Sequence, residues 1–185
     1  SELFDLGQFR VIVFDFFENV VGAIAVVLRH SQQSVHVSGD IVLAIDLLPV
    51  APMPGVESLE GDFTEQAALA WLEEKLKSGR VDLVLSDMAP NISGVMLADQ
   101  ARHYELCELA LDFAVNWLKP DGSFLVKVFQ GVGFEDFRTQ MRQAYGQLLI
   151  RKPDASRDRS TEVYLLGRHP VVAQDSAVTS SQNSV

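Results

Sequence analysis

The sequence predicts an α/β fold with a doubly wound, mostly parallel seven-stranded sheet that ends in an antiparallel hairpin. Two observations lead to this fold class. Short apolar runs of the kind buried in sheets alternate with amphipathic helical segments, which is typical of parallel strands joined by helices. The last two apolar runs are separated by a loop too short for a helix, so these strands should pair antiparallel at one edge.

The expected strands are short runs rich in branched and aromatic side chains, which fit the interior of a sheet. In chain order they cover residues 9–17, 41–45, 56–59, 81–87, 123–129, 147–151 and 162–166. Residues 20–29 fit either a short helix or a continued strand, because their apolar run has no periodicity that separates the two.

Three amphipathic segments are the expected helices, over residues 65–77, 101–118 and about 134–145. Thr64 can cap the first helix and Gly79 can end it. Pro120 stops the second. We expect residues 91–100 to form a loop, and residues 170–185, which lack periodicity, to form a disordered tail.

The composition is that of one soluble globular domain, with 185 residues of which 48% are apolar and 22% charged. No apolar run approaches the length of a membrane helix, so we expect no membrane association. The single cysteine, Cys107, favours a reducing compartment and has the spacing of a core thiol. Because the chain does not open on methionine, we expect it to be a fragment or a processed product.

The formal net charge of −10 argues against a broad nucleic-acid surface, because phosphate binding depends on lysine and arginine. A binding site for nucleic acid would therefore need a local basic patch. One such patch precedes Glu162, the first residue of the final strand. Its cations are Arg151, Lys152, Arg157 and Arg159, which can contact phosphates or form a solvated charged turn.

Three aspartates, Asp46, Asp62 and Asp87, each follow an apolar run. The carboxyl ends of parallel strands share one edge, where open α/β sheets bind ligands. An acid there can accept hydrogen bonds from a ribose after the second strand, meet an adenine amino group after the third, and lie near the reacting centre after the fourth. The alternative, that each aspartate caps a loop or helix, stays open.

Lys127 is embedded in the apolar run Leu125–Phe129. A buried lysine is costly unless a carboxylate pairs with it, and Asp87 is the natural partner if the two strands are adjacent. The alternative is a lysine at the end of its strand that reaches solvent. We expect no metal site.

Six segments, taken in order and spacing, closely resemble the FtsJ/RrmJ-type ribosomal RNA 2′-O-ribose methyltransferases (the RlmE family). They are IDLLP, LEGDF, LVLSDMAPNISG, HYELCELALDFA, LKPDGSFLVKVFQGVGFEDF and IRKPDASRDRSTEVYLLGR. The resemblance runs from Ile41 to Gly167 and is far more specific than a lone glycine motif.

The resemblance implies a methyltransferase domain over residues 1–169 that moves the methyl group of S-adenosylmethionine to the 2′-hydroxyl of a uridine in large-subunit ribosomal RNA. It implies a cytoplasmic enzyme, expected to be a monomer, that acts on the 50S subunit. Of the family's Lys-Asp-Lys-Glu tetrad, Asp87, Lys127 and Glu162 match the last three members. Asp46 and Asp62, together with Asp87, are implied to contact the cofactor.

Two segments depart from the family pattern. No residue matches the first lysine of the tetrad, and Asp15–Ala23 reads DFFENVVGA where the family carries a glycine-rich loop. The alternative function is therefore a catalytically impaired or inactive paralogue that acts as a binding protein. A dinucleotide-dependent dehydrogenase would need GxGxxG after the first strand, and the sequence has none.

Overall fold

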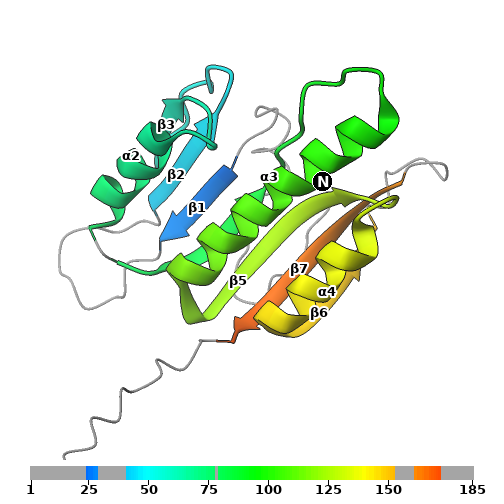
Figure 1. The fold of residues 1–185 in the computed structure, drawn as a ribbon. Coiled ribbons are helices and arrows are strands. Elements are labelled where there is room, and N and C mark those ends of the chain that lie inside the picture. Colours follow the sequence, from blue (N-terminus) through cyan, green and yellow to red (C-terminus); the bar gives the residue numbers. More distant parts are fainter. Residues whose placement is uncertain (1–23, 29–40, 78, 153–160, 172–185) are drawn as a thin grey trace, which may run out of the picture.

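The computed structural model describes residues 24–28, 41–77, 79–152 and 161–171. Seven strands form one sheet in it, and three helices pack on that sheet (Figure 1). The strands are β1 (Ile24–Leu28), β2 (Ile41–Asp46), β3 (Val56–Glu60), β4 (Val81–Ser86), β5 (Leu118–Phe129), β6 (Tyr145–Arg151) and β7 (Glu162–Pro170). The helices are α2 (Gln66–Leu76), α3 (Met96–Trp117) and α4 (Phe134–Ala144).

The α/β fold class is confirmed, and most elements lie where the sequence places them. The open choice for residues 20–29 is decided in favour of a strand, β1, whereas the expected strand 9–17 lies outside the described residues. Helix α3 begins at Met96, so the loop predicted for residues 91–100 is wrong in its second half. None of the helices in the described ranges is both long and apolar enough to cross a bilayer.

The sheet has the strand order β3-β2-β1-β4-β5-β7-β6, and it is not mostly parallel among its described strands. The β2–β3 and β4–β5 pairs are parallel, and β6 and β7 pair antiparallel. The difference from the prediction is β1, which runs antiparallel to both of its neighbours. Ile24 pairs with Ile45 and Ser86 at the carboxyl ends of β2 and β4, while Leu28 pairs with Ile41 at the opposite edge.

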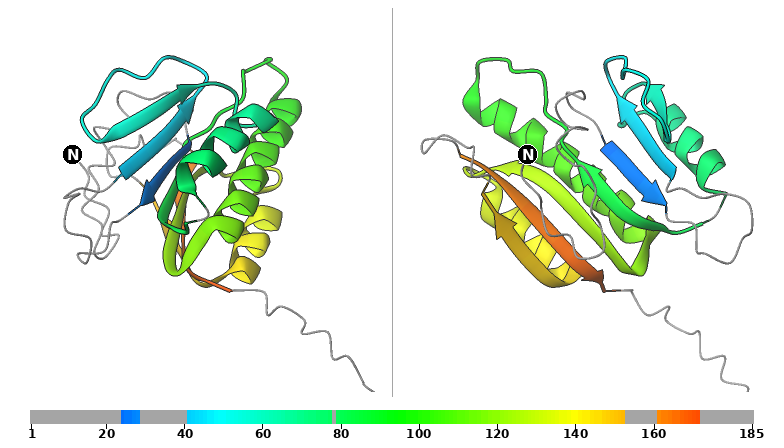
Figure 2. Two further views of the ribbon diagram at one scale, coloured as in Figure 1. Left: turned by 90° about the vertical axis from the view of Figure 1, so that its left-hand side faces the viewer. Right: turned by 180° about the vertical axis from the view of Figure 1, so that it is seen from behind.

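Helices α2, α3 and α4 all lie on one face of the sheet (Figure 2). Alternate strand residues point to opposite faces, so the sheet carries one apolar cluster on each face. The larger cluster joins Val84, Phe124 and Leu165 to the helices. The smaller cluster gathers the other face of the sheet, with Ala44, Leu83, Leu85, Leu125 and Leu166. The helical layer of a doubly wound fold on this second face stays a prediction, since no described helix covers it.

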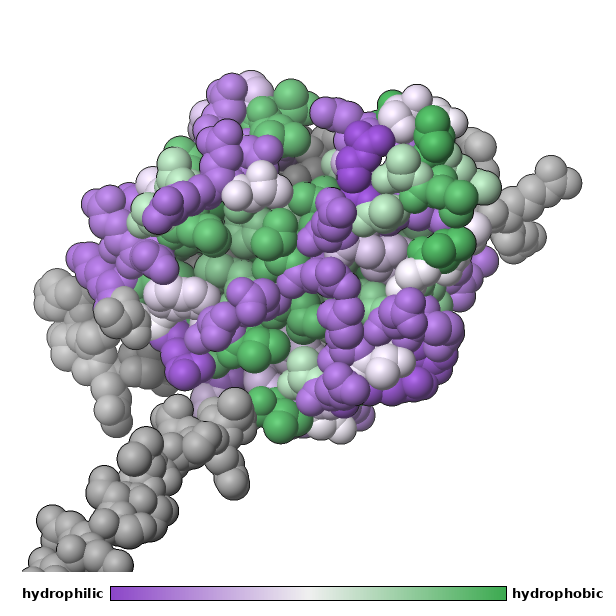
Figure 3. All heavy atoms as spheres, in the orientation of Figure 1, coloured by the Kyte–Doolittle hydropathy of each residue, from purple (hydrophilic) through white to green (hydrophobic). Residues whose placement is uncertain are grey.

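Apolar side chains also reach the surface, most clearly over the amino end of α3 (Figure 3). Ile92, Val95, Met96 and Leu97 are all more than half exposed there. They follow Asp87 closely in the chain, so this apolar surface adjoins the carboxyl edge of the sheet.

We expect Leu72→Ala in α2 to lower the free energy of unfolding by roughly 2–5 kcal/mol, because the fully buried side chain leaves a cavity between α2 and the sheet. Leu69→Ala is the matched control, since Leu69 lies on the same helix with 37% of its surface exposed. It should cost less than about 1 kcal/mol by the burial it loses. Urea unfolding measures both variants, and equal losses would contradict the packing described for α2.

Candidate active site

The carboxyl ends of β4 and β5 bring a buried ion pair together. Because Ser86 pairs with Val126, the next residues in each strand, Asp87 and Lys127, become neighbours. Lys127 Nζ contacts Asp87 Oδ1, and the two side chains are only 15% and 12% exposed. The predicted partnership is therefore confirmed, and the alternative of a lysine that reaches solvent is wrong.

Side-chain alternation explains why this pair lies on the face of the sheet that the described helices leave free. Leu83 and Leu85 belong to the cluster on that face, so Asp87, two residues on, points the same way. Leu125 belongs to the same cluster, so Lys127, two residues further along β5, also points to this face. Both charged side chains therefore stand at the end of an apolar row, where the local dielectric is low.

Burial raises the pKa of the Asp87 carboxyl above its ordinary value, although Lys127 opposes the rise. Glu162 and Asp46 add to it through their negative charges. Asp87 is thus a more basic carboxylate than an exposed aspartate, and it holds a proton more readily.

Glu162 joins the pair from β7. It pairs in register with Phe129 at the end of β5, two residues beyond Lys127, and it is half-buried. Its negative charge adds a small part to the rise in the pKa of Asp87, after burial. The structure thus brings Asp87, Lys127 and Glu162 together at one edge.

Asp46 lies at the same edge, at the end of β2, and is 2% exposed. Its Oδ1 accepts a hydrogen bond from the Leu48 amide at 2.9 Å. Asp62 follows β3, and its Oδ1 accepts hydrogen bonds from the Thr64 amide at 2.8 Å and the Thr64 hydroxyl at 2.7 Å. Each aspartate therefore holds a local turn through one oxygen, as the capping alternative predicts, and retains a second oxygen for a ligand.

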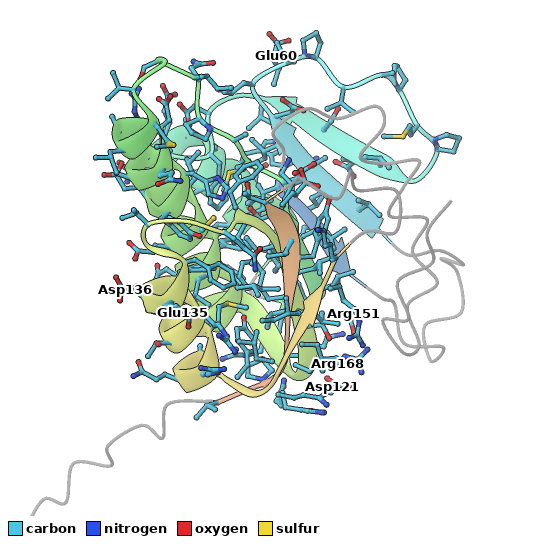
Figure 4. All side chains as sticks on the ribbon, turned by 90° about the vertical axis from the view of Figure 1, so that its right-hand side faces the viewer. Glu60, Asp121, Glu135, Asp136, Arg151 and Arg168 are labelled. Carbon is cyan, nitrogen blue, oxygen red and sulfur yellow. The ribbon has the colours of Figure 1, made fainter. Side chains whose placement is uncertain are left out.

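The predicted basic patch begins at the same edge. Arg151 ends β6 opposite Tyr164, and both Arg151 and Lys152 are exposed. Figure 4 shows Arg151 and Arg168 on the side of the sheet away from α4, which carries the acidic Glu135 and Asp136. The other two predicted cations, Arg157 and Arg159, lie outside the described residues.

The sequence reasoning missed a cavity of about 480 Å³ at the end of β5, two residues beyond Lys127. The loop after Asp87, the first turns of α3, Phe129 and Thr161 line it. His103 is the most buried polar group of its wall, and its Nε2 lies 3.4 Å from Cys107 Sγ. The four-residue spacing of His103 and Cys107 on the apolar face of α3 could have indicated that the imidazole is buried beside the thiol. Burial also confirms Cys107 as a core thiol and raises its pKa to about 12.

Two glycines let the loop after β5 close on α3. Gly133 has φ 91°, and a Cβ there would lie 2.8 Å from the Tyr104 ring. At Gly131 a Cβ would lie 2.4 Å from Gln100 Nε2. The Tyr104 hydroxyl donates to the carbonyl of Phe129 at 2.6 Å, which fixes the end of β5 against the helix. The position of Lys127 near this end depends on the same contacts.

His103 should make stability fall as the pH is lowered from about 6.5 to about 4. Burial, and to a smaller extent the charge of Lys127, lowers the pKa of His103 from 6.5 to about 4. Between these two pH values the imidazole is protonated in the unfolded chain and neutral in the folded chain, so the unfolded state is favoured as the pH falls. We expect a loss of about 2–3 kcal/mol across the window. Urea unfolding of His103→Gln should show a correspondingly smaller loss, and an unchanged pH dependence would contradict the burial of a neutral imidazole.

Comparison with known proteins shows which family the chain resembles. The profile of the FtsJ-like methyltransferase family matches residues 8–169. Ribosomal RNA large subunit methyltransferase E of Thiobacillus denitrificans is 78% identical over 138 residues, which cover 75% of this chain and 63% of that protein. The proteins of the same name from Azoarcus and Dechloromonas aromatica are 64% and 57% identical, over 68% and 70% of this chain.

The matched part of the chain spans slightly less than two thirds of each relative, 63% in Thiobacillus denitrificans and 62% in Azoarcus. Among solved structures, a ribosomal RNA methyltransferase from Plasmodium falciparum superposes with a TM-score of 0.60 at 22% identity. The superposition covers 69% of this chain and 71% of that one, and it supports the fold. With the family profile matching most of its length, the chain belongs to the FtsJ-like methyltransferase family.

Proposed function

We propose that this chain methylates the 2′-hydroxyl of a uridine ribose in large-subunit ribosomal RNA, with S-adenosylmethionine as the methyl donor. The names of its relatives support the reaction and the RNA. The observation that carries the proposal is the buried Lys127–Asp87 pair with Glu162 beside it, at the edge of the sheet where α/β folds bind ligands.

The residues at the carboxyl edge fit the cofactor. S-adenosylmethionine carries a sulfonium cation, a ribose and an adenine, and when bound it supplies an electrophilic methyl group. Asp46 offers a buried carboxylate oxygen that can accept hydrogen bonds from ribose hydroxyls, and Asp62 can meet the adenine amino group. Asp87, Glu162 and Asp46 place negative charge at this edge, which adds to the rise that burial causes in the pKa of Asp87 and favours a cation there.

The Lys127–Asp87 pair can prepare the acceptor hydroxyl. A ribose hydroxyl is a poor nucleophile, so a group that orients it and takes its proton raises its reactivity. Lys127 is fixed between Asp87 and the ring of Phe129, with Nζ 5.8 Å from the ring centroid. In this position the ammonium can orient the hydroxyl oxygen, while the adjacent basic carboxylate of Asp87 accepts the proton.

The RNA backbone is proposed to bind at Arg151 and Lys152, and also at Arg157 and Arg159, which follow them in the sequence and lie outside the described residues. Phosphate contacts of this kind position a nucleic acid without reading its bases. We further propose the 50S subunit as the substrate particle, a cytoplasmic monomer, a methyltransferase domain over residues 1–169 and a tail over 170–185.

A specific observation favours the second candidate function, a catalytically impaired relative that binds without turnover. The carboxyl end of β1, Leu28, lies at the edge opposite Asp46, because β1 is antiparallel to β2. In a parallel arrangement this end would lie at the proposed cofactor edge. The two functions are separated by whether the chain transfers methyl groups.

We expect Lys127→Met to reduce methyl transfer roughly 10²–10⁴-fold, as for the loss of a group that handles the reacting proton. The measurement is the incorporation of labelled methyl into 50S subunits isolated from a strain without the native enzyme. Lys119→Met is the matched control, because Lys119 lies on the same strand and pairs with Asp82 of β4 at 2.8 Å. Full activity of Lys127→Met would remove the proposed role, and no transfer by the unaltered chain would favour the binding protein.

We expect Asp46→Asn to weaken S-adenosylmethionine binding by about 10-fold or more, since hydrogen bonds to a charged acceptor contribute roughly 1.5–3 kcal/mol. The asparagine keeps an Oδ1 that accepts from the Leu48 amide, so the turn should persist. Calorimetry measures the affinity, with Asp121→Asn at an exposed position as the control. Equal affinities of the two variants would mean that Asp46 serves only the turn.

A further inference from the structure

The lining of the cavity of about 480 Å³ includes close sequence neighbours of all three candidate catalytic residues, although not these residues themselves. Its lining includes Ala89, Phe129 and Thr161. Ala89 follows Asp87 by two residues, Phe129 follows Lys127 by two, and Thr161 directly precedes Glu162. A molecule in this cavity would therefore lie beside the reacting centre.

The strand order separates this cavity from the proposed cofactor residues. Asp46 and Asp62 follow β2 and β3, which lie on one side of β4 in the sheet. Phe129 and Thr161 lie at the ends of β5 and β7, on the other side. Since methyl transfer proceeds in line between donor and acceptor, the acceptor belongs on the β5–β7 side of Asp87.

The Phe129 ring connects the cavity to the ion pair. Its centroid is 5.8 Å from Lys127 Nζ and 4.9 Å from the centroid of the His103 ring. The rest of the cavity is largely apolar, with Pro90, Ile92 and Met96 at its walls. Aromatic and apolar walls of this kind suit the faces of a nucleobase, which stack on such surfaces.

Two polar atoms in this wall are buried and have no hydrogen-bond partner within the described ranges, His103 Nδ1 and Gln100 Oε1. Cys107 fixes the state of the imidazole. Its thiol lies 3.8 Å from the carbonyl of Lys127, and with the thiol hydrogen directed there His103 Nε2 donates to Cys107 Sγ. Neutral His103 then has an unprotonated Nδ1, so two residues that line the cavity carry buried acceptors without a donor in the described ranges.

We propose that this cavity binds the base of the nucleotide whose ribose is methylated, with a ring N–H of the base donating to His103 Nδ1. The inference rests on the proposed function and adds to it a base-reading subsite made by α3. Among pyrimidines, uracil carries an N–H at the 3-position and cytosine carries an acceptor there. The subsite therefore selects uracil, and His103 is its specificity-determining residue.

The test compares uridine 5′-monophosphate with 3-methyluridine 5′-monophosphate, in which a methyl group replaces the N3 hydrogen. Both are titrated into the whole chain labelled with ¹⁵N-histidine, and the Nδ1 resonance of His103 is followed by NMR. We expect saturable movement of this resonance with uridine monophosphate and binding at least about 10-fold weaker with the methylated analogue, because the acceptor is then left buried and unpaired. Cytidine monophosphate should behave like the methylated analogue.

Equal binding of the three nucleotides, or no movement of the His103 resonance at millimolar uridine monophosphate, would overturn the proposal. The unaltered chain serves for this comparison, so the result does not depend on how a variant folds. His103→Phe keeps a planar ring without the acceptor and should remove the preference between the three nucleotides. A retained preference in this variant would also count against the proposal.

The outcome is separable from that of the proposed function. Methyl transfer to 50S subunits without a response of His103 would refute the subsite and leave the enzyme. A selective response of His103 in a chain that transfers no methyl group would support the subsite and refute the proposed catalysis.

Discussion

The ion pair between Lys127 and Asp87 is the interaction on which the candidate site depends. Two opposite charges lie largely out of water, each at the end of an apolar row, and the loss of hydration consumes most of their attraction. The pair therefore adds little to the stability of the fold. Its consequence is chemical, because burial makes Asp87 a stronger base while Lys127 remains next to it.

Much of the fold follows from local patterns in the sequence. The apolar runs from Ile41 onward and the helical periodicity of α2 and α4 correspond to real elements, because each buries one face that its own sequence specifies. The start of α3 was not predictable in the same way. Its first turn has no capping side chain of its own, and Asp99 instead accepts hydrogen bonds from the Ser93 amide and hydroxyl in the preceding loop. This contact depends on the folded loop.

The direction of β1 was also beyond the sequence patterns. A buried strand presents apolar residues to both faces in either direction, so the run Ile24–Leu28 carries no information about which way it points. The direction is set by pairing with β2 and β4, which are distant in the chain. The expectation of parallel strands came from the alternation of strands and helices, and β1 does not follow it.

Some features of the candidate site could likewise be predicted from the sequence, and others could not. Acids at strand ends were predictable, since β2 and β4 run in the same direction and so bring Asp46 and Asp87, which end or follow them, to one edge. The link between Lys127 and Asp87 needed only the adjacency of β4 and β5. The cavity around His103 was not predictable, because its walls come from a loop, a helix and the end of a strand. Gln100 and His103 approach Phe129 only after two glycines allow close packing.

The strands β4 and β5 are tied at both ends, by Asp82 with Lys119 and by Asp87 with Lys127. Around the first of these ion pairs β5 advances from Leu118 to Ser123 while β4 advances only from Val81 to Leu83, so the extra residues of β5 bulge out of the ladder there. From Leu83 and Ser123 onward the two strands stay in register, up to the edge where Asp87 and Lys127 pair. The irregularity of the ladder is therefore confined to the edge opposite the candidate site.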